Sequence, residues 1–563
     1  MTAAQTSSAT AAKPAGQSLI RSSMVYSGVT LISRFVGLLR DLVVTYAMGA
    51  SATFAADAYN TAFAFPNLFR RIFAEGAFAA AFVPAYAKAL EQDGEEKADI
   101  LAADAMALLA AMTLTLAVVC ALAMPWLMYV IAPGFAKNPA KFHLAIVLTQ
   151  ITIWYLPCMA IYAHLSGVLN ARNRFILSAG APILLNIWTL ATVLPTHSPV
   201  GAATMASWGV IAAGVSQALV LMWGVRRSGA AVHWRWPRMT PEIWALVRRA
   251  VPGAVAGSAV QVNLFVSGIL VSGVNGARTW LAVADRLYQL PLGLVGVAIG
   301  VALLPRLSRA VHARDRADAQ GAMDEAVTFA MALTLPAAAA LVAIPLFLID
   351  GLYTRGEFTF HDAQQTAAAL FWYGLGTPAF VLSQLYSRAF FARQDTRTPM
   401  RFALVSVAVN IVLGVTLVFA LGFVGIAIAT AAASWLNVAQ MAVTLARRGH
   451  YRPSATAWSR LIRIAAASLA LGLALGLVQH FRPEIQSLFS GFHIGRRLVG
   501  AKEAAILLTV LAGMALYPPL LVAFGGLKPA EIRRALRRPA RAPTLDEEVK
   551  QDLGKTPAGP DLL

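Results

Sequence analysis

The chain has 563 residues, of which 58% are hydrophobic and only 13% are charged. Because soluble globular domains carry about 25% charged residues, this composition excludes a soluble enzyme and indicates a polytopic membrane protein. The net charge of +19 does not indicate nucleic-acid binding, because the Lys and Arg residues lie mostly in short loops between apolar segments.

The N-terminal residues 1–20 are rich in Ala, Ser and Thr without an apolar period, so we expect a disordered tail. The first apolar segment lacks a small-residue cleavage site and is predicted to be a spanning helix, not a signal peptide. About 20 apolar residues cross a bilayer. On this basis about fourteen transmembrane helices are expected, at residues 24–48, 55–89, 98–131, 142–170, 176–196, 202–225, 243–273, 279–310, 320–350, 362–391, 400–420, 424–446, 460–480 and 502–525.

An internal repeat divides these helices into two halves. Pro84 in AFVPAYAKAL and Pro305 in ALLPRLSRAV lie 221 residues apart, and the same number separates Ala171 in LNARNRF from Ala392 in FFARQDT. Two matches at one separation indicate two pseudo-symmetric six-helix lobes, which are typical of alternating-access transporters. We expect an N-lobe at 21–227, a C-lobe at 240–448, two further helices at 458–526 and a disordered basic tail at 527–563.

The distribution of positive charge predicts the orientation of the chain. Alternate loops near residues 172, 226, 309, 393 and 447 contain two or more arginines each, whereas loops 49–54, 197–201 and 421–423 contain no Lys or Arg. The positive-inside rule therefore places the first set and both termini in the cytoplasm. The loop at 481–501 is an exception with three arginines, but late loops weigh less in setting topology.

Charged residues interrupt three of the predicted helices. A charge at the bilayer centre costs about 2.5–3.5 kcal/mol on insertion scales, so these residues should face a polar cavity or one another. Five arginines against four carboxylates leave one cation spare, and the guanidinium suits bidentate contact with phosphate or carboxylate oxygens, so an anionic cargo is expected. The residues are Arg34, Arg40 and Asp41, then Asp57, Arg70, Arg71 and Glu75, and finally Asp285 and Arg286.

The stretch SRFVGLLRD (33–41) raises a geometric question about the first helix. Arg34 and Asp41 are seven residues apart and share nearly one helix face, but Arg40 points about 120° away from Arg34. Both arginines can border one cavity only if the helix bends near Gly37 or the cavity is wide.

A structural alternative applies to these charges. Charged pairs can lock helices together, and arginines near helix ends can extend to the membrane interface. The spacing of four residues favours this alternative for Arg71 and Glu75. For Arg34, Arg70 and Arg286 a role in function is favoured, because intramembrane charge marks substrate pathways.

Other kinds of site find no support in the sequence. The histidines show no metal-ligand spacing, and there is no Walker A motif, so neither a metal site nor a cofactor is predicted. The cysteines Cys120 and Cys158 lie in apolar segments without a pairing motif and are expected to be free. The sequence does not locate a coupling ion.

Three stretches together resemble a known family. They are SRFVGLLRD, DAYNTAFAFPNLFRRIFAEGAFAAAFVPAYAKAL and ADRLYQLPLGLVGVAIGVALLPRLS, with further matches at APGF (132–135) and FARQDTRTP (391–399). The chain is similar over about residues 20–530 to the MurJ (MviN) family, bacterial lipid II flippases of the multidrug/oligosaccharidyl-lipid/polysaccharide (MOP) exporter superfamily.

The resemblance implies a transporter of the inner membrane and not an enzyme. Such a protein carries lipid II, the undecaprenyl-diphosphate-linked MurNAc-pentapeptide-GlcNAc, from the cytoplasmic to the periplasmic leaflet for cell wall synthesis. It also implies a groove for the lipid tail in the last two helices, a monomeric protein, and membrane lipids and the cell-wall synthesis machinery as partners.

The resemblance also assigns residues to the transport site. The family's cavity arginines match Arg34, Arg40, Arg70 and Arg286, which are expected to bind the diphosphate and nearby headgroup. The supporting polar residues expected around that cavity are Asp41, Asp57, Asn67, Glu75, Asp285 and Gln289. Some members have Glu where this chain has Gln289, which puts a carboxylate role at that position in doubt.

Two other classes of protein are weighed against a flippase. A polytopic glycosyltransferase or polymerase would need acidic residues on sizeable outward loops, whereas the outward loops here are short and the longest is mostly basic. A drug antiporter of the same superfamily would more often place carboxylates in its cavity for cationic drugs.

Overall fold

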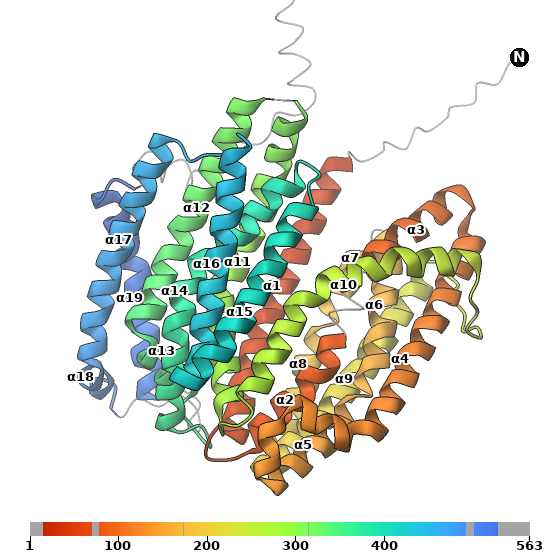
Figure 1. Ribbon diagram of the computed structural model, residues 1–563, viewed down its shortest axis with the longest axis horizontal. Coiled ribbons are helices and arrows are strands. Elements are labelled where there is room, and N and C mark those ends of the chain that lie inside the picture. Colours follow the sequence, from red (N-terminus) through yellow and green to blue (C-terminus); the bar gives the residue numbers. More distant parts are fainter. Residues whose placement is uncertain (1–14, 70–77, 173, 314, 491–499, 527–563) are drawn as a thin grey trace, which may run out of the picture.

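The structure, a computed structural model, describes residues 15–69, 78–172, 174–313, 315–490 and 500–526 (Figure 1). Every regular element in these residues is helical, which confirms the predicted all-α class. The first half contains α1 (Ala15–Met48), α2 (Ala55–Phe69), α3 (Phe78–Gln92), α4 (Glu95–Ile131), the 3₁₀ helix η2 (Pro133–Lys137), α5 (Pro139–Thr152), α6 (Tyr155–Ala171), α7 (Phe175–Gly180), α8 (Ile183–Val193) and α9 (Pro199–Arg227).

The second half is also helical. It contains α10 (Pro241–Leu270), α11 (Ala277–His312), α12 (Arg316–Ala343), α13 (Pro345–Tyr353), α14 (Phe360–Phe391), α15 (Arg397–Leu421), α16 (Val424–Arg447), α17 (Ala455–His480), α18 (Arg482–Ser487) and α19 (Ala501–Ala523). Because α1 begins at Ala15, the first helix already starts within the segment predicted as a tail. The remainder of that segment, and the predicted tail at 527–563, lie outside the described residues.

Ten helical stretches within the described residues are long and apolar enough to cross a bilayer. They coincide with ten of the fourteen predicted segments. The other four predicted segments contain α1, α2 with α3, α10 and α11 in their described residues, but are not among those ten. The total of fourteen spans therefore stays a prediction.

Local sequence explains where several helices begin. Ser198 accepts a hydrogen bond from the Gly201 amide and precedes Pro199, the first residue of α9. Thr240 precedes Pro241 in the same way at the start of α10. A hydroxyl N-cap followed by proline is a strong helix start, because proline lacks the amide that would otherwise stay unbonded.

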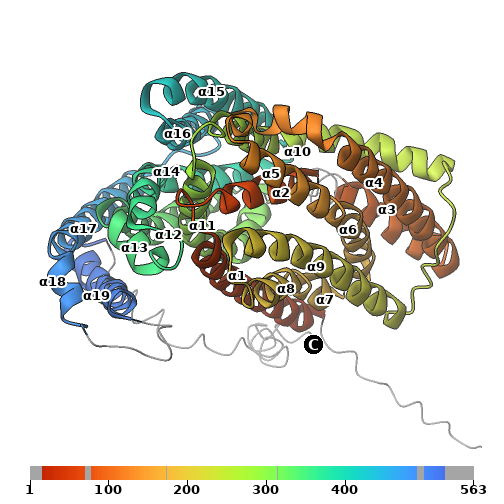
Figure 2. The same cartoon turned by 90° about the horizontal axis from the view of Figure 1, so that it is seen from below.

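The helices form two groups with an added pair. In Figure 1, α2–α9 lie on the right, α11–α16 lie in the centre, and α17–α19 lie on the left. α1 packs against α7, α8 and α9, while α10 touches α3 and α4 at one end and α15 at the other, so α10 links the groups. Figure 2 shows α17–α19 on the outer side of α12 and α13.

The 221-residue repeat recurs in the backbone. The Arg174 amide donates to the Leu169 carbonyl at 2.8 Å, and the Asp395 amide donates to the Phe390 carbonyl at 3.1 Å. Both bonds close the same turn, one after α6 and one after α14. The matching motifs LNARNRF and FFARQDT thus encode matching helix ends.

Two ends of the molecule differ in chemistry. We call the end formed by the loops after α6, α9, α14 and α16 the arginine-rich end. There Arg172 donates to the Ser228 carbonyl at 3.1 Å, and Arg448 forms an ion pair with Asp395 at 2.7 Å. The loops before α9 and α16 lie at the opposite end, because each helix runs between the two.

Candidate functional site

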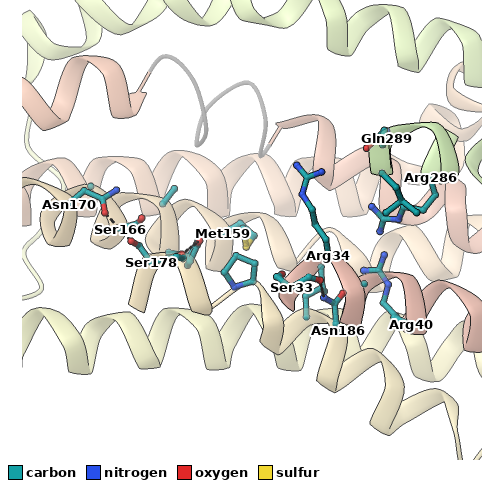
Figure 3. Close-up of a pocket in the computed structure, with 18 of the residues that line it drawn as sticks. Ser33, Arg34, Arg40, Met159, Ser166, Asn170, Ser178, Asn186, Arg286 and Gln289 are labelled. Atoms are coloured by element: carbon teal, nitrogen blue, oxygen red, sulfur yellow. Dashed lines mark hydrogen bonds between the residues drawn. The ribbon is translucent and has the colours of Figure 1, made fainter. Parts of the chain in front are cut away.

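A cavity of about 660 Å³ lies between α1, α6, α7 and α8 on one side and α11 on the other (Figure 3). Most of its wall comes from the first half of the chain, and α11 contributes three residues. The lining residues are Ser33, Arg34, Gly37, Arg40, Val83, Met159, Tyr162, Ala163, Ser166, Gly167, Asn170, Ser178, Ala179, Pro182, Leu185, Asn186, Arg286, Gln289 and Leu290.

Two of the cavity arginines share one carboxylate. Arg40 donates to Asp41 Oδ1 from Nε at 3.0 Å and from Nη2 at 2.6 Å. Arg286 of α11 donates from Nε to the other oxygen, Oδ2. The guanidinium groups of Arg40 and Arg286 are thus held at the cavity by a residue of α1, and one carboxylate offsets two positive charges.

Arg34 is held differently. Its side chain is exposed to the cavity, and its guanidinium lies against Gly293 of α11 so closely that a methyl group there would overlap it. The absence of a side chain at position 293 leaves room for the Arg34 guanidinium against α11, and a methyl group there would make the flexible end of Arg34 move. No ion pair to Arg34 is found within the described part of the chain.

The two arginines of SRFVGLLRD do border one cavity. α1 is assigned as one continuous helix from Ala15 to Met48, and Arg34 and Arg40 both line the cavity on either side of Gly37.

The cavity is strongly cationic. Arg34, Arg40 and Arg286 line it, and none of the described lining residues is Asp or Glu. Gln289 lines it one helical turn after Arg286 and donates to Asp285. The lining therefore attracts anions, and the arginines offer the paired donors that phosphate oxygens accept.

Several predicted residues fall elsewhere. Asp285 lies beside the cavity as a partner of Gln289, and Asn67 lies in α2; neither belongs to the lining, contrary to expectation. Arg70, Arg71 and Glu75 lie outside the described residues.

Asp57 was expected at the cavity but is not among the residues that line it. Its carboxylate is fully buried at the opposite end and pairs with Lys141 of α5 at 2.7 Å. It also accepts from the amides of Gly276 and Thr279, at 2.8 Å and 3.1 Å, at the start of α11. A helix N-terminus attracts a carboxylate because its first amides are unbonded. Charge counting could not reveal this, because Lys141 and the start of α11 are distant in sequence.

The halves of the molecule meet at this same opposite end. Besides Asp57, Ser51 donates to Asp362 through its amide at 2.9 Å and its hydroxyl at 2.5 Å, and Asn275 donates to the Ser51 carbonyl at 2.7 Å. We call these contacts, together with the amide hydrogen bonds to Asp57 and the hydrogen bond from Lys141 Nζ to Asn275 Oδ1 at 3.0 Å, the interlobe seam. The seam joins residues that are more than 130 positions apart in sequence.

The APGF motif (132–135) belongs to the interlobe seam. Gly134 lies against Gly273 with no room for a side chain, and its amide donates to Ser272 Oγ at 3.0 Å. The ring of Phe135 lies 4.2 Å from Lys141 Nζ, a cation–π contact. The motif thus allows the backbones to approach and places an aromatic face on the buried ammonium.

Neutral polar residues of the lining were missed by sequence analysis. Ser166 and Asn170 of α6, Ser178 of α7 and Asn186 of α8 reach the cavity. The available signal was a set of polar side chains on one face of the segments at 142–170 and 176–196, whereas the predicted site rested mainly on charged residues. The described residues hold no group of three His, Cys, Asp or Glu side chains suited to a metal, and Cys120 and Cys158 are free thiols.

Comparisons with known proteins agree with one another. The family model described as lipid II flippase MurJ matches residues 44–493. A Rhizobium tropici protein described as a probable lipid II flippase MurJ is 38% identical over 537 residues, which are 94% of this chain and 99% of that protein. The lipid II flippase MurJ of Burkholderia cenocepacia is 32% identical, covering 80% of this chain and 89% of that protein.

Solved structures support the same fold. A lipid II flippase MurJ in an inward closed conformation matches with a TM-score of 0.71 at 23% identity, covering 92% of this chain and 100% of that chain. An inward-facing MATE family multidrug resistance transporter of the MOP superfamily matches with a TM-score of 0.61 at 15% identity, over 76% of this chain and 98% of that chain. The fold is therefore that of a MOP-type membrane transporter.

Proposed function

Because the chain belongs to the MurJ family, we propose that it flips lipid II from the cytoplasmic to the periplasmic leaflet of the bacterial inner membrane. It is a multi-pass transporter, not an enzyme. The observation that carries the proposal is the cavity lined by Arg34, Arg40 and Arg286 without a lining carboxylate. A diphosphate carries the charge and the acceptor oxygens that these side chains require.

The orientation follows from the two ends. We place the arginine-rich end and both termini in the cytoplasm, according to the positive-inside rule. The cavity extends along α6 to Asn170, one residue before the end of this helix and close to the arginine-rich end. The interlobe seam closes the other end, so this state supports entry of the headgroup from the cytoplasmic side.

Release to the periplasm requires the interlobe seam to open. Lys141 and Asp57 of the first half are suited to a reversible closure, because both hydrogen-bond to residues 275–279 of the second half and both regain water when the halves separate. Burial of these charges is costly, so the water that they regain on opening offsets part of the hydrogen bonding that is lost. In this scheme the cavity arginines carry the headgroup while the seam determines which side is accessible.

The transport assay must separate a flippase from a drug antiporter. Purified protein in proteoliposomes is given fluorescent lipid II or a cationic dye, and appearance in the opposite leaflet or the lumen is measured. Lipid II should be flipped and the dye should not, because a cationic cavity repels a cation. Transport of the dye without lipid II would overturn the proposal.

Two variants test whether flipping depends on a cavity arginine. Arg34→Ala should reduce lipid II flipping at least about tenfold, equivalent to about 1.4 kcal/mol of lost interaction. Arg401→Ala is the matched control, because Arg401 is exposed on α15 outside the cavity, and it should leave flipping unchanged. Equal flipping by both variants would show that the cavity arginine has no role.

A further inference from the structure

The arginines occupy one part of the cavity, and much of the remaining wall is polar but uncharged. We call Ser166, Asn170, Ser178 and Asn186 the neutral wall. In Figure 3 it extends from Asn186, near Ser33 and Arg40, to Asn170 at the far side. None of these four residues carries a charge.

The local structure of α6 presents this wall to the cavity. From residue 163 to residue 170 only Ser166 and Asn170 keep partial exposure, and the residues between and before them are buried. These two positions are four apart and therefore share one helix face. With Tyr162 one turn earlier, the face extends over nine residues, a rise of about 12 Å along the helix.

The amides of the neutral wall are oriented by the protein. Ser178 Oγ donates to Asn170 Oδ1 at 2.9 Å, so the Asn170 amide offers its Nδ2 donors in another direction. Asn186 Nδ2 donates to the Ser33 carbonyl at 3.2 Å, so Asn186 offers its Oδ1 acceptor. The wall thus presents both donors and acceptors, whereas arginine can only donate.

We propose that the neutral wall is the sugar-binding part of the site, next to the arginines that hold the diphosphate. The inference rests on the proposed function, in which a lipid-linked disaccharide enters this cavity. Sugar hydroxyls both donate and accept hydrogen bonds, and oriented amides and hydroxyls match them. A peptide stem carries charged groups that would call for opposite charges, and the neutral wall has none.

The internal repeat shows that this wall belongs to one half of the molecule. At the separation of 221 residues, Ser387, Phe391 and Pro399 correspond to Ser166, Asn170 and Ser178. Ser387 Oγ donates to the Ser383 carbonyl at 2.8 Å, and none of the three lines the cavity. The polar set is therefore not a general feature of this helix pair.

The test compares three ligands that differ in one part each. Full-length protein in nanodiscs is titrated with undecaprenyl diphosphate, with the undecaprenyl-diphosphate-linked disaccharide lacking peptide, and with lipid II. In the unaltered protein the disaccharide should tighten binding relative to undecaprenyl diphosphate. The double variant Ser166→Ala/Asn170→Ala should lose about tenfold of this preference, as expected for two neutral hydrogen bonds.

Controls make each outcome decisive. Undecaprenyl diphosphate affinity, which the arginines set, should change less than about twofold in the double variant, and this also shows that the variant is folded. Ser387→Ala should keep the full preference, and Arg34→Ala should weaken all three ligands. A preference that survives the double variant, or that appears only when the peptide is added, overturns the inference. Failure of the unaltered protein to bind any of the three would instead overturn the proposed function.

Discussion

Asp41 of α1 accepts a hydrogen bond from Arg286 of α11, and this contact ties the two halves of the molecule together at the cavity. The same carboxylate holds Arg40, so one residue positions two of the three lining arginines. Without it, two guanidinium groups would face each other uncompensated in a largely apolar protein. Asp41 therefore both positions the guanidinium groups of Arg40 and Arg286 and offsets their positive charge.

A double-mutant cycle should detect that coupling. Asp41→Asn, Arg286→Gln and the double variant are compared by thermal unfolding in detergent without substrate. Each single variant should destabilise the protein, and the coupling free energy should be about 1–3 kcal/mol, because the groups are in contact and only partly exposed. Additive effects within about 0.5 kcal/mol would show that the pair is not coupled. The same cycle on the exposed pair Arg306 and Asp318 is the control and should give less than about 1 kcal/mol.

Gly293 should influence transport through the position of Arg34. A methyl group at position 293 would displace the end of the Arg34 side chain but keep its charge in the cavity, so Gly293→Ala should lower flipping by less than the roughly tenfold expected for Arg34→Ala. Combining the two substitutions should add little, since both remove the same contact. Gly321→Ala on α12, where a methyl group meets open space, is the control and should transport normally. Normal flipping by Gly293→Ala would contradict the assigned position of Arg34.

Removing the buried ammonium of the interlobe seam should open it. Lys141→Met leaves Asp57 buried without its partner, a change that costs about 3–5 kcal/mol and favours states in which the carboxylate meets water. Spin labels at His197→Cys and Leu421→Cys, in a background with Cys120 and Cys158 replaced, report the distance between the halves at that end.

The distance distribution should shift to longer values in Lys141→Met. Lys502→Met is the matched control, because Lys502 pairs with Asp350 between α19 and α13 and takes no part in the interlobe seam. An unchanged distribution in Lys141→Met would mean that Lys141 does not hold the seam closed.

The loop between α14 and α15 should make stability depend on pH. Hydrogen bonds from Thr398, together with the Arg448 guanidinium, lower the pKa of Asp395 from 3.8 to about 2. Because the pKa is lower in the folded protein, the ionised carboxylate stabilises the fold fully when the pH is above the ordinary pKa of 3.8. This stabilisation is lost as the pH falls from 3.8 through about 2.

Asp395→Ala should therefore cost about 1 kcal/mol near neutral pH, a typical value for a helix-start hydrogen bond. The difference in unfolding temperature from the unaltered protein should shrink below about pH 4. Asp93→Ala, in an exposed turn, is the control and should show no such dependence. A difference that stays constant down to about pH 2 would contradict the lowered pKa.

Sequence patterns predicted much of the fold for identifiable physical reasons. Apolar runs of bilayer length predicted helices that the structure contains, and matching motifs such as those around Leu169 and Phe390 predicted matching turns. Helix boundaries were less accurate, as at Ala15, because apolar periodicity does not mark where a helix extends beyond the membrane.

The site was predicted in part. Arg34, Arg40 and Arg286 could be found because isolated charge in an apolar segment is costly and needs a reason. Asp57 was misplaced because the same cost is also met by burial against Lys141 and the start of α11, and only tertiary structure distinguishes the two solutions. The role of Gly293 could not be seen because it depends on how close α1 lies to α11.

The central claim is that the cavity arginines bind the diphosphate of lipid II. A cryo-electron microscopy structure of the full chain in nanodiscs with lipid II tests it most directly. The account predicts diphosphate density within hydrogen-bonding distance of Arg34 and of Arg286 or Arg40. Diphosphate density outside this cavity, with the three arginines unchanged, would contradict it.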